Sequence, residues 1–126
     1  MKHYENLVVI KATLTDEEIK AQVESIKENI IKNGGEIVTV NEMGNKRLAY
    51  VIDKQKRGFY VDFFFKVKPA AINEIERLER LNENLLKFLT VKYESKREVA
   101  AFDLMVSKVT KKSDNNASEE EVKTEE

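Results

Sequence analysis

The stretch that most constrains the fold is a strand, a polar turn and a second strand near the middle of the chain. Over residues 47–52, large apolar side chains occupy the even positions, Leu48, Tyr50 and Ile52. The odd positions carry Arg47, Ala49 and Val51. This period of two is typical of a half-buried strand. Residues 53–58 carry no large apolar side chain and end in Gly58, and a second apolar run follows over 59–65. We expect an antiparallel hairpin with a loop over 53–58.

A strand and a helix are expected before this hairpin. The first strand covers residues 3–10, and a capping box formed by Thr15 and Glu18 begins the helix. Its apolar stripe recurs at spacings of four, three and four: Ile19, Val23, Ile26 and Ile30. Two glycines at 34–35 end the helix, and a second strand begins at Ile37 and is interrupted at Gly44 by an expected bulge.

A helix and a strand are expected after the hairpin. Pro69 opens the helix at a position where its missing N–H costs nothing. The apolar side of this helix is supplied by Ile72, Ile75, Leu78 and Leu81. The last strand covers residues 86–93.

The expected order, β-α-β-β-α-β, predicts a ferredoxin-like α+β sandwich. Right-handed crossovers place both helices on one face of a four-stranded antiparallel sheet, and the other face stays bare unless something covers it. We divide the chain into a folded domain over 1–94, a partly apolar extension over 95–112 and a disordered acidic tail over 113–126.

The net charge of −1 conceals an uneven distribution. Residues 1–112 contain 21 Lys and Arg and 17 Asp and Glu, a net +4, whereas residues 113–126 contain one Lys and six acids, a net −5. There is no Cys, and no apolar run approaches the length of a membrane span. A cytoplasmic protein is therefore expected, with neither a disulfide framework nor a thiolate metal site.

Residues 1–94 resemble the sixth protein of the bacterial small ribosomal subunit, the S-six family. The resemblance rests on the joint order and spacing of several short motifs, none decisive alone. They are His3-Tyr4-Glu5, Asn33-Gly34-Gly35-Glu36, Gly44-Asn45-Lys46-Arg47-Leu48-Ala49-Tyr50 with Ile52 and Lys54, Gly58-Phe59-Tyr60, Pro69, Arg80-Leu81, and Leu89-Thr90-Val91. The resemblance implies a ferredoxin-like fold, binding to the central domain of 16S ribosomal RNA, and a heterodimer with ribosomal protein S-eighteen. It implies no enzyme activity and no cofactor.

Basic residues at the hairpin are the first candidates for RNA contact: Lys46, Arg47, Lys54, Lys56 and Arg57. Such residues neutralise phosphates, the term that dominates affinity for nucleic acids. The alternative is an ordinary solvated turn, and the resemblance favours RNA contact most for Arg47 and Lys54.

A second basic patch is expected where the first and last strands meet. Its members are Lys2, His3, Tyr4, Lys87, Lys92 and Tyr93. Tyr and His can stack on unpaired bases, although Tyr4 fits the core equally well. Arg80, at the end of the second helix, either reaches RNA or pairs with a neighbouring Glu.

Other functions find little support in the sequence. Residues 57–63 resemble the third-strand signature of RNA-recognition-motif domains, but the small residue after the first aromatic is missing, and we treat the match as coincidence. His3 is the only histidine, no catalytic constellation accompanies it, and 11–15 lacks the Arg-rich loop of an acylphosphatase-like enzyme. The alternative function is a ferredoxin-like regulatory or dimerisation domain that binds no RNA.

Two further expectations concern partners. Seven of the eight residues over 99–106 are apolar, so we expect this stretch to dock on the bare sheet face or on a partner protein. A body of net +4 offers few phosphate contacts, so we also expect tight RNA binding only together with a strongly basic partner.

Overall fold

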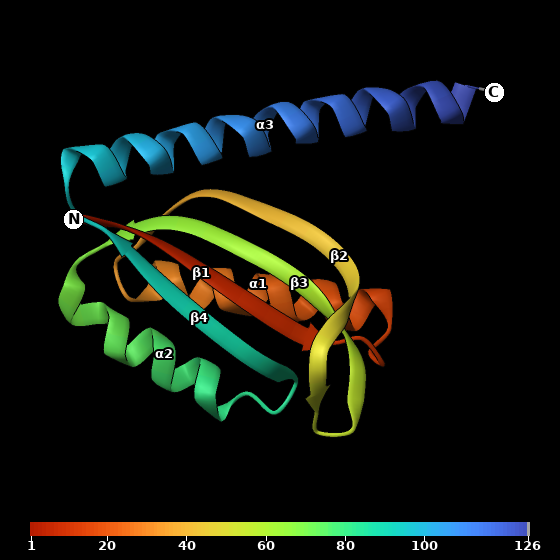
Figure 1. Cartoon of the computed structure of the whole chain (residues 1–126), viewed down its shortest axis with the longest axis horizontal. Helices are drawn as coiled ribbons and strands as arrows, with labels where there is room; N and C mark the ends of the chain where they lie inside the picture. Colours follow the sequence, from red (N-terminus) through yellow and green to blue (C-terminus); the bar gives the residue numbers. More distant parts are fainter. Residues whose placement is uncertain (126) are drawn as a thin grey trace.

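The computed structural model contains one four-stranded antiparallel sheet and three α-helices (Figure 1). It describes the backbone of residues 1–125 and the side chains of residues 1–110. The elements are β1 (Lys2–Lys11), α1 (Asp16–Lys32), β2 (Glu36–Ile52), β3 (Gln55–Val67), a 3-10 turn (Pro69–Ala71), α2 (Ile72–Leu81), β4 (Leu85–Tyr93) and α3 (Lys96–Glu125). The strand order is β2-β3-β1-β4, which confirms the predicted ferredoxin-like arrangement. In the described part of the chain, no helix is long and apolar enough to span a membrane.

The helix ends follow the local sequence. The Thr15 hydroxyl accepts a hydrogen bond from the backbone N–H of Glu18 at 3.2 Å, which confirms the capping box. At the other end of α1, Gly34 has a φ of +85°, a left-handed conformation that glycine adopts without steric cost. Pro69 stands at the start of the 3-10 turn that leads into α2.

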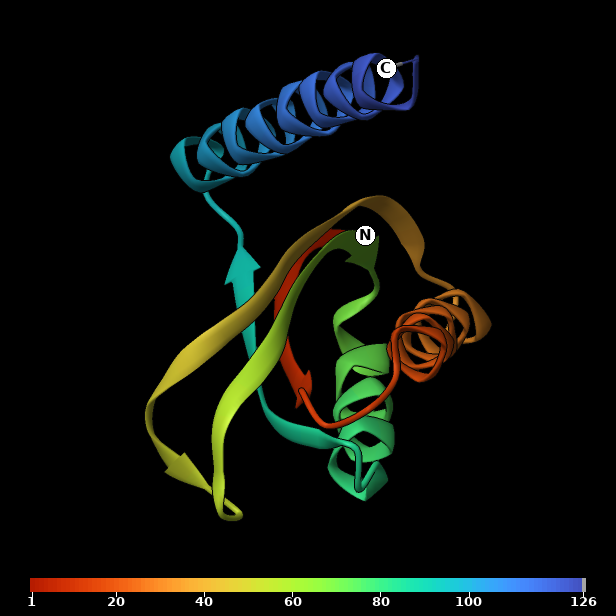
Figure 2. The same ribbon diagram turned by 90° about the vertical axis from the view of Figure 1, so that its right-hand side faces the viewer.

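The main core lies between the sheet and the helices α1 and α2, which cover the same face (Figure 2). Residues of even number on β1 and odd number on β3 face this core, as do the four stripe residues of α1: Tyr4, Val8, Ile10, Val61, Phe63, Phe65, Val67, Ile19, Val23, Ile26 and Ile30. Leu81, expected on the apolar side of α2, is exposed and is the last residue of that helix.

The opposite sheet face is covered at one end by α3. Phe102 is 1% exposed, and its ring meets those of His3, Phe64 and Tyr93 edge-on, with centroids 5.0, 5.5 and 5.5 Å apart. Of the two expected docking sites for residues 99–106, the sheet face or a partner protein, the structure shows the sheet face, contacted by Phe102 with Met105 and Val106 beside it. The helix itself was not expected from the sequence. The predicted disordered tail, 113–126, lies beyond the residues whose side chains are described and stays a prediction.

The hairpin differs from the expectation in its turn. Ile52 pairs with Gln55, so the predicted loop over 53–58 shrinks to a two-residue turn. Asp53 and Lys54 both have positive φ, 46° and 65°, as the twist of a two-residue hairpin requires. The bulge predicted at Gly44 is present, with a register shift between Glu42 and Gly44.

Candidate nucleic-acid interface

The hairpin arm, which we define as residues 46–57, extends beyond the body of the sheet (Figure 1). Arg47 pairs with Arg57 and Ile52 with Gln55, so four residues of β2, 48–51, lie opposite the single residue Lys56 of β3. Such an excess on one strand bends it and increases its twist. The bend turns Leu48 back toward the sheet, where its side chain approaches Gly58 and is buried.

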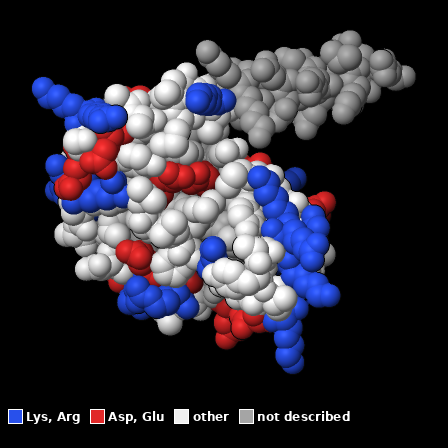
Figure 3. Space-filling view, in the orientation of Figure 1, with Lys and Arg blue, Asp and Glu red and all other residues white. Residues whose placement is uncertain are grey.

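Basic side chains cover the outside of this arm. All five predicted residues are exposed: Lys46, Arg47, Lys54, Lys56 and Arg57. Figure 3 shows Lys and Arg gathered along the side of the molecule that holds the hairpin. The guanidinium of Arg57 donates to Oδ1 of Asn45 at 2.7 Å, which fixes one of these charges in place. The structure thus brings together the first predicted group of candidates.

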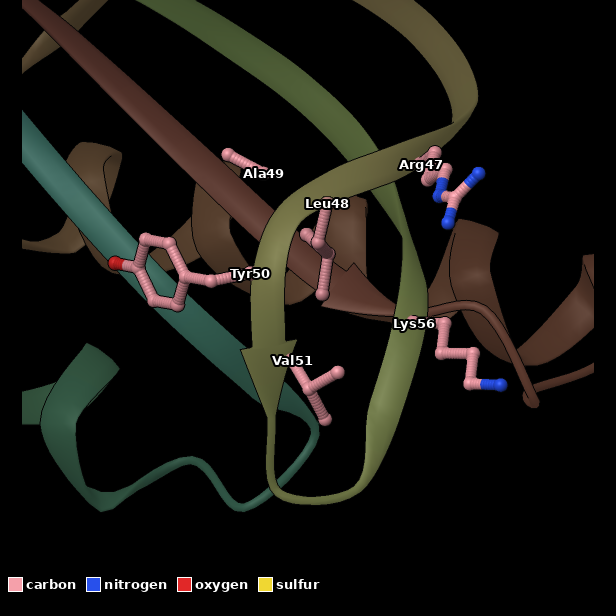
Figure 4. A pocket seen from close by; sticks show the side chains of 6 residues that line it. All are labelled: Arg47, Leu48, Ala49, Tyr50, Val51 and Lys56. Atoms are coloured by element: carbon pink, nitrogen blue, oxygen red, sulfur yellow. The ribbon is translucent and has the colours of Figure 1, made fainter.

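A pocket of ≈160 Å³ lies on the arm and is lined by Arg47, Leu48, Ala49, Tyr50, Val51 and Lys56 (Figure 4). Arg47 and Lys56 extend to one side of the arm, whereas Tyr50 points to the other side, toward β4. Tyr50 is 63% exposed, and the ammonium of Lys87 lies 5.5 Å from its ring centroid. Tyr50 was not among the predicted site residues, although an aromatic residue three positions after Arg47 was a usable signal.

The second predicted patch is not a single site. His3 pairs with Tyr93 and Tyr4 with Lys92, whereas Lys87 pairs with Val9 toward the opposite end of β4. Tyr4 is 3% exposed and stacks on Phe65, so of its two predicted positions the core is correct and its inclusion among the RNA-contacting residues is wrong. His3 packs against Phe102 instead of forming an open aromatic surface.

Lys2, Lys92 and Arg80 remain on the surface. A hydrogen bond with Glu94, at 2.8 Å, raises the pKa of Lys92 above its usual value. Arg80 lies in the last turn of α2. The ion pair found on that helix joins Arg77 to Glu74, at 2.6 Å.

The match to an RNA-recognition-motif strand finds no support in the geometry. On the face of β3 away from α1 and α2, the strand presents Tyr60, Asp62 and Phe64, because odd-numbered residues face the core. Phe64 is covered by Phe102 of α3, and Asp62 is an acid. This face of β3 therefore offers no pair of open aromatic rings for stacking bases.

Comparison with known proteins decides the family. The model of the family "Ribosomal protein S6" matches residues 3–92. The chain belongs to the ribosomal protein S6 family. Among its relatives, the small ribosomal subunit protein bS6 of Sulfurimonas denitrificans is 48% identical over 122 residues, which cover 97% of this chain and 89% of the relative. The bS6 protein of Campylobacter concisus is 53% identical over 103 residues, covering 82% of this chain and 74% of the relative.

A solved structure agrees with this assignment. The crystal structure of 30S ribosomal protein S6 from Thermotoga maritima superposes with a TM-score of 0.71 at 25% sequence identity, and the match covers 93% of this chain and 97% of that one. Membership of the ribosomal protein S6 family confirms the resemblance seen in the sequence and the expected place in the small ribosomal subunit. It is a family of ribosomal structural proteins and not of enzymes.

Proposed function

We propose that this chain binds the central domain of 16S ribosomal RNA as one half of a heterodimer with ribosomal protein S-eighteen. The hairpin arm supplies the main RNA contact of this chain. The observation that carries the proposal is the set of five exposed basic side chains along one arm, from Lys46 to Arg57. Their common position lets them follow a phosphate backbone, which a scattered set of charges cannot do.

The arm is also built to hold its charges in a defined shape. The two-residue turn and the strand pairing of Arg47 with Arg57 place basic side chains on both strands. Arg47 and Arg57 are directly opposite each other, and like charges in this position repel. An anion that binds between them would remove this repulsion. A phosphate group of RNA is such an anion.

The need for a partner follows from the number of contacts. RNA sites of high affinity use several phosphate contacts, about 6–10 in strongly salt-dependent complexes. The arm offers five basic residues, and of the other predicted cations Lys92 is paired with Glu94 and His3 packs against Phe102. A strongly basic partner supplies the remaining positive charge.

The test is a titration of a central-domain fragment of 16S ribosomal RNA at physiological salt. Three samples are compared: this chain alone, protein S-eighteen alone and the equimolar mixture. The proposal expects tight binding only for the mixture. Tight binding by this chain alone, unchanged when the partner is added, contradicts the pairing. No binding by any sample favours a regulatory or dimerisation domain without an RNA ligand.

A further inference from the structure

The sequence contains one Asn-Gly pair, Asn33-Gly34, and the structure places it where α1 ends and the chain turns toward β2. Figure 2 shows this junction at the edge of the molecule, away from the hairpin arm. Asn33 is half-buried and Gly34 is exposed, and a Cβ added at Gly34 would meet no atom within 4 Å. The space beside the glycine is therefore free for a change of backbone conformation.

An Asn-Gly pair can lose the side-chain amide of the asparagine without an enzyme. The backbone nitrogen of the glycine gives up its proton to base and attacks the asparagine Cγ. A new N–Cγ bond forms, and the side-chain nitrogen leaves as ammonia. Water then opens the cyclic imide at either carbonyl carbon, which gives aspartate or, where the main chain now runs through Cγ, isoaspartate. Glycine favours the attack because it has no Cβ to obstruct its nitrogen.

Both nitrogens of this reaction are hydrogen-bonded in the folded chain. Nδ2 of Asn33 donates to the backbone oxygen of Asn29 at 2.7 Å. The backbone N–H of Gly34, whose nitrogen would attack, donates to the carbonyl oxygen of Ile31 at 2.9 Å. Ring closure therefore requires both bonds to break, and this happens when the last turn of α1 opens.

The products would disturb this end of the helix. An aspartate at position 33 sets a carboxylate against the carbonyl oxygen of Asn29, and its negative charge lies at the unfavourable end of the helix dipole. Isoaspartate adds a carbon atom to the main chain beside Gly35, whose N–H donates to the carbonyl of Ile30 at 2.9 Å. A Cβ on Gly35 would lie only 2.6 Å from the Ile30 side chain, so the lengthened backbone has little room here.

We propose that Asn33 is a site of spontaneous conversion to aspartate and isoaspartate, and that opening of the last turn of α1 sets its rate. The closed turn delays the reaction. A chain whose α1 end opens often is permanently marked at this residue, and the mark weakens the turn further. The reaction uses only water and base, so it does not depend on RNA binding or on a protein partner.

The test follows Asn33 in the full chain at pH 8, once folded and once unfolded in concentrated urea. Peptide mass spectrometry measures the conversion of amide to acid, and methylation by an isoaspartyl methyltransferase detects the isoaspartate. The folded chain should react at least about tenfold more slowly than the unfolded chain. This slowing should match the hydrogen-exchange protection of the Gly34 N–H in the folded chain, because the same opening frees that group for both reactions.

Two glycine substitutions locate the opening. Ile31 is exposed in the last turn of α1, so Ile31→Gly weakens that turn without emptying the core, and conversion at Asn33 should become about two- to threefold faster. Ser25→Gly, at an exposed position earlier in the same helix, is the matched control and should react like the wild type. Asn33→Gln keeps an amide but lengthens the side chain, and its product should be absent.

Equal rates in the folded and unfolded chains, or a slowing unrelated to the Gly34 exchange, would overturn the role of the turn. Equal acceleration in Ile31→Gly and Ser25→Gly would replace the last turn by opening of the whole helix. Failure of the unfolded chain to convert, over a period in which a short Asn-Gly peptide does, would overturn the site itself. The comparison of folded with unfolded wild type needs no variant, and circular dichroism checks that both glycine variants fold.

Discussion

Asn6 on β1 donates a hydrogen bond from Nδ2 to Oε2 of Glu79 on α2, at 3.2 Å, and both side chains are buried. The same amide nitrogen donates to the hydroxyl of Thr90 at 3.0 Å. The second oxygen of each partner, Asn6 Oδ1 and Glu79 Oε1, is buried without a hydrogen-bond partner among the described residues. Burial without a compensating cation in the described part of the chain disfavours the charged form of Glu79, so a neutral carboxyl suits this site better than a carboxylate.

Glu79→Gln should therefore stabilise the protein at pH 8. The amide group keeps an acceptor for Asn6 and removes the buried charge. We expect a gain on the order of 1–2 kcal/mol in the free energy of unfolding at pH 8, and a smaller gain at pH 5. Urea unfolding at both pH values measures it. Glu83→Gln, an exposed residue just after α2, is the control, and a destabilised Glu79→Gln protein at pH 8 would contradict the neutral-carboxyl interpretation.

The pH dependence of stability should follow from Glu79 and Asp62 together. Burial raises the pKa of Glu79 from 4.5 to about 7, and that of Asp62 from 3.8 to about 9. A raised pKa means that the folded state binds the proton more tightly, so this stability is complete below the unfolded pKa and is lost as pH rises through the folded pKa. The free energy of unfolding should fall between pH 5 and pH 9, by at most about 1.4 kcal/mol per pH unit for each group.

The two groups can be separated by substitution. Glu79→Gln should flatten the decline only below about pH 7, whereas Asp62→Asn should flatten it over the whole range and abolish it between pH 7 and pH 9. The measurement is a series of urea unfolding curves at half-unit steps of pH. A wild-type protein whose stability rises steadily over this range would show that neither carboxyl is held neutral in the folded state.

The docking of α3 should depend on Phe102. Its ring fills the space between His3, Phe64 and Tyr93. Truncating a buried phenylalanine costs about 3–5 kcal/mol when the structure stays in place, and a terminal helix can instead detach at a lower cost. In Phe102→Ala, amide exchange should therefore accelerate along residues 96–110 and stay unchanged in β1 and β3. Leu104→Ala, on the exposed side of the same helix, should leave exchange as in the wild type. Protected amides over 96–110 in Phe102→Ala would mean that other contacts hold α3.

The sequence predicted most of the fold because its signals were local. The capping box at Thr15, the glycine after α1 and the proline before α2 each act within a few residues of themselves. The helix α3 was missed, although buried residues recur there at helical spacing: Phe102, Val109 and the half-buried Val99 and Val106. In the sequence this stripe was read as one apolar run, and a run does not distinguish a helix from a strand or a linker.

The candidate site was predictable only in part, because it depends on contacts between distant residues. The basic arm could be found since its charges lie close together in the sequence. The strand register of the arm could not be predicted. The alternation from Leu48 to Ile52 does not indicate that four residues of β2, 48–51, lie opposite the single residue Lys56 of β3. The pKa of Asp62 is raised only in the folded chain, by burial and then by Glu5, which lies 57 positions earlier in the sequence. Likewise, the position of Tyr4 in the core is set by Phe65 on the neighbouring strand.

The hairpin arm should control the salt dependence of RNA binding. Arg47 is exposed on the arm, so Arg47→Ala should change the free energy of unfolding by less than about 0.5 kcal/mol. If it contacts a phosphate, its removal lowers the slope of log affinity against log salt by about 0.7–0.9. The measurement is a titration of the central-domain RNA fragment with the mixture of this chain and protein S-eighteen, at several salt concentrations. Arg77→Ala is the matched control, because Arg77 is an exposed arginine on α2 that is already paired with Glu74. An Arg47→Ala slope equal to that of Arg77→Ala would remove Arg47 from the interface. A lower slope for Arg47→Ala alone, with the same stability, would locate the phosphate contact on the arm.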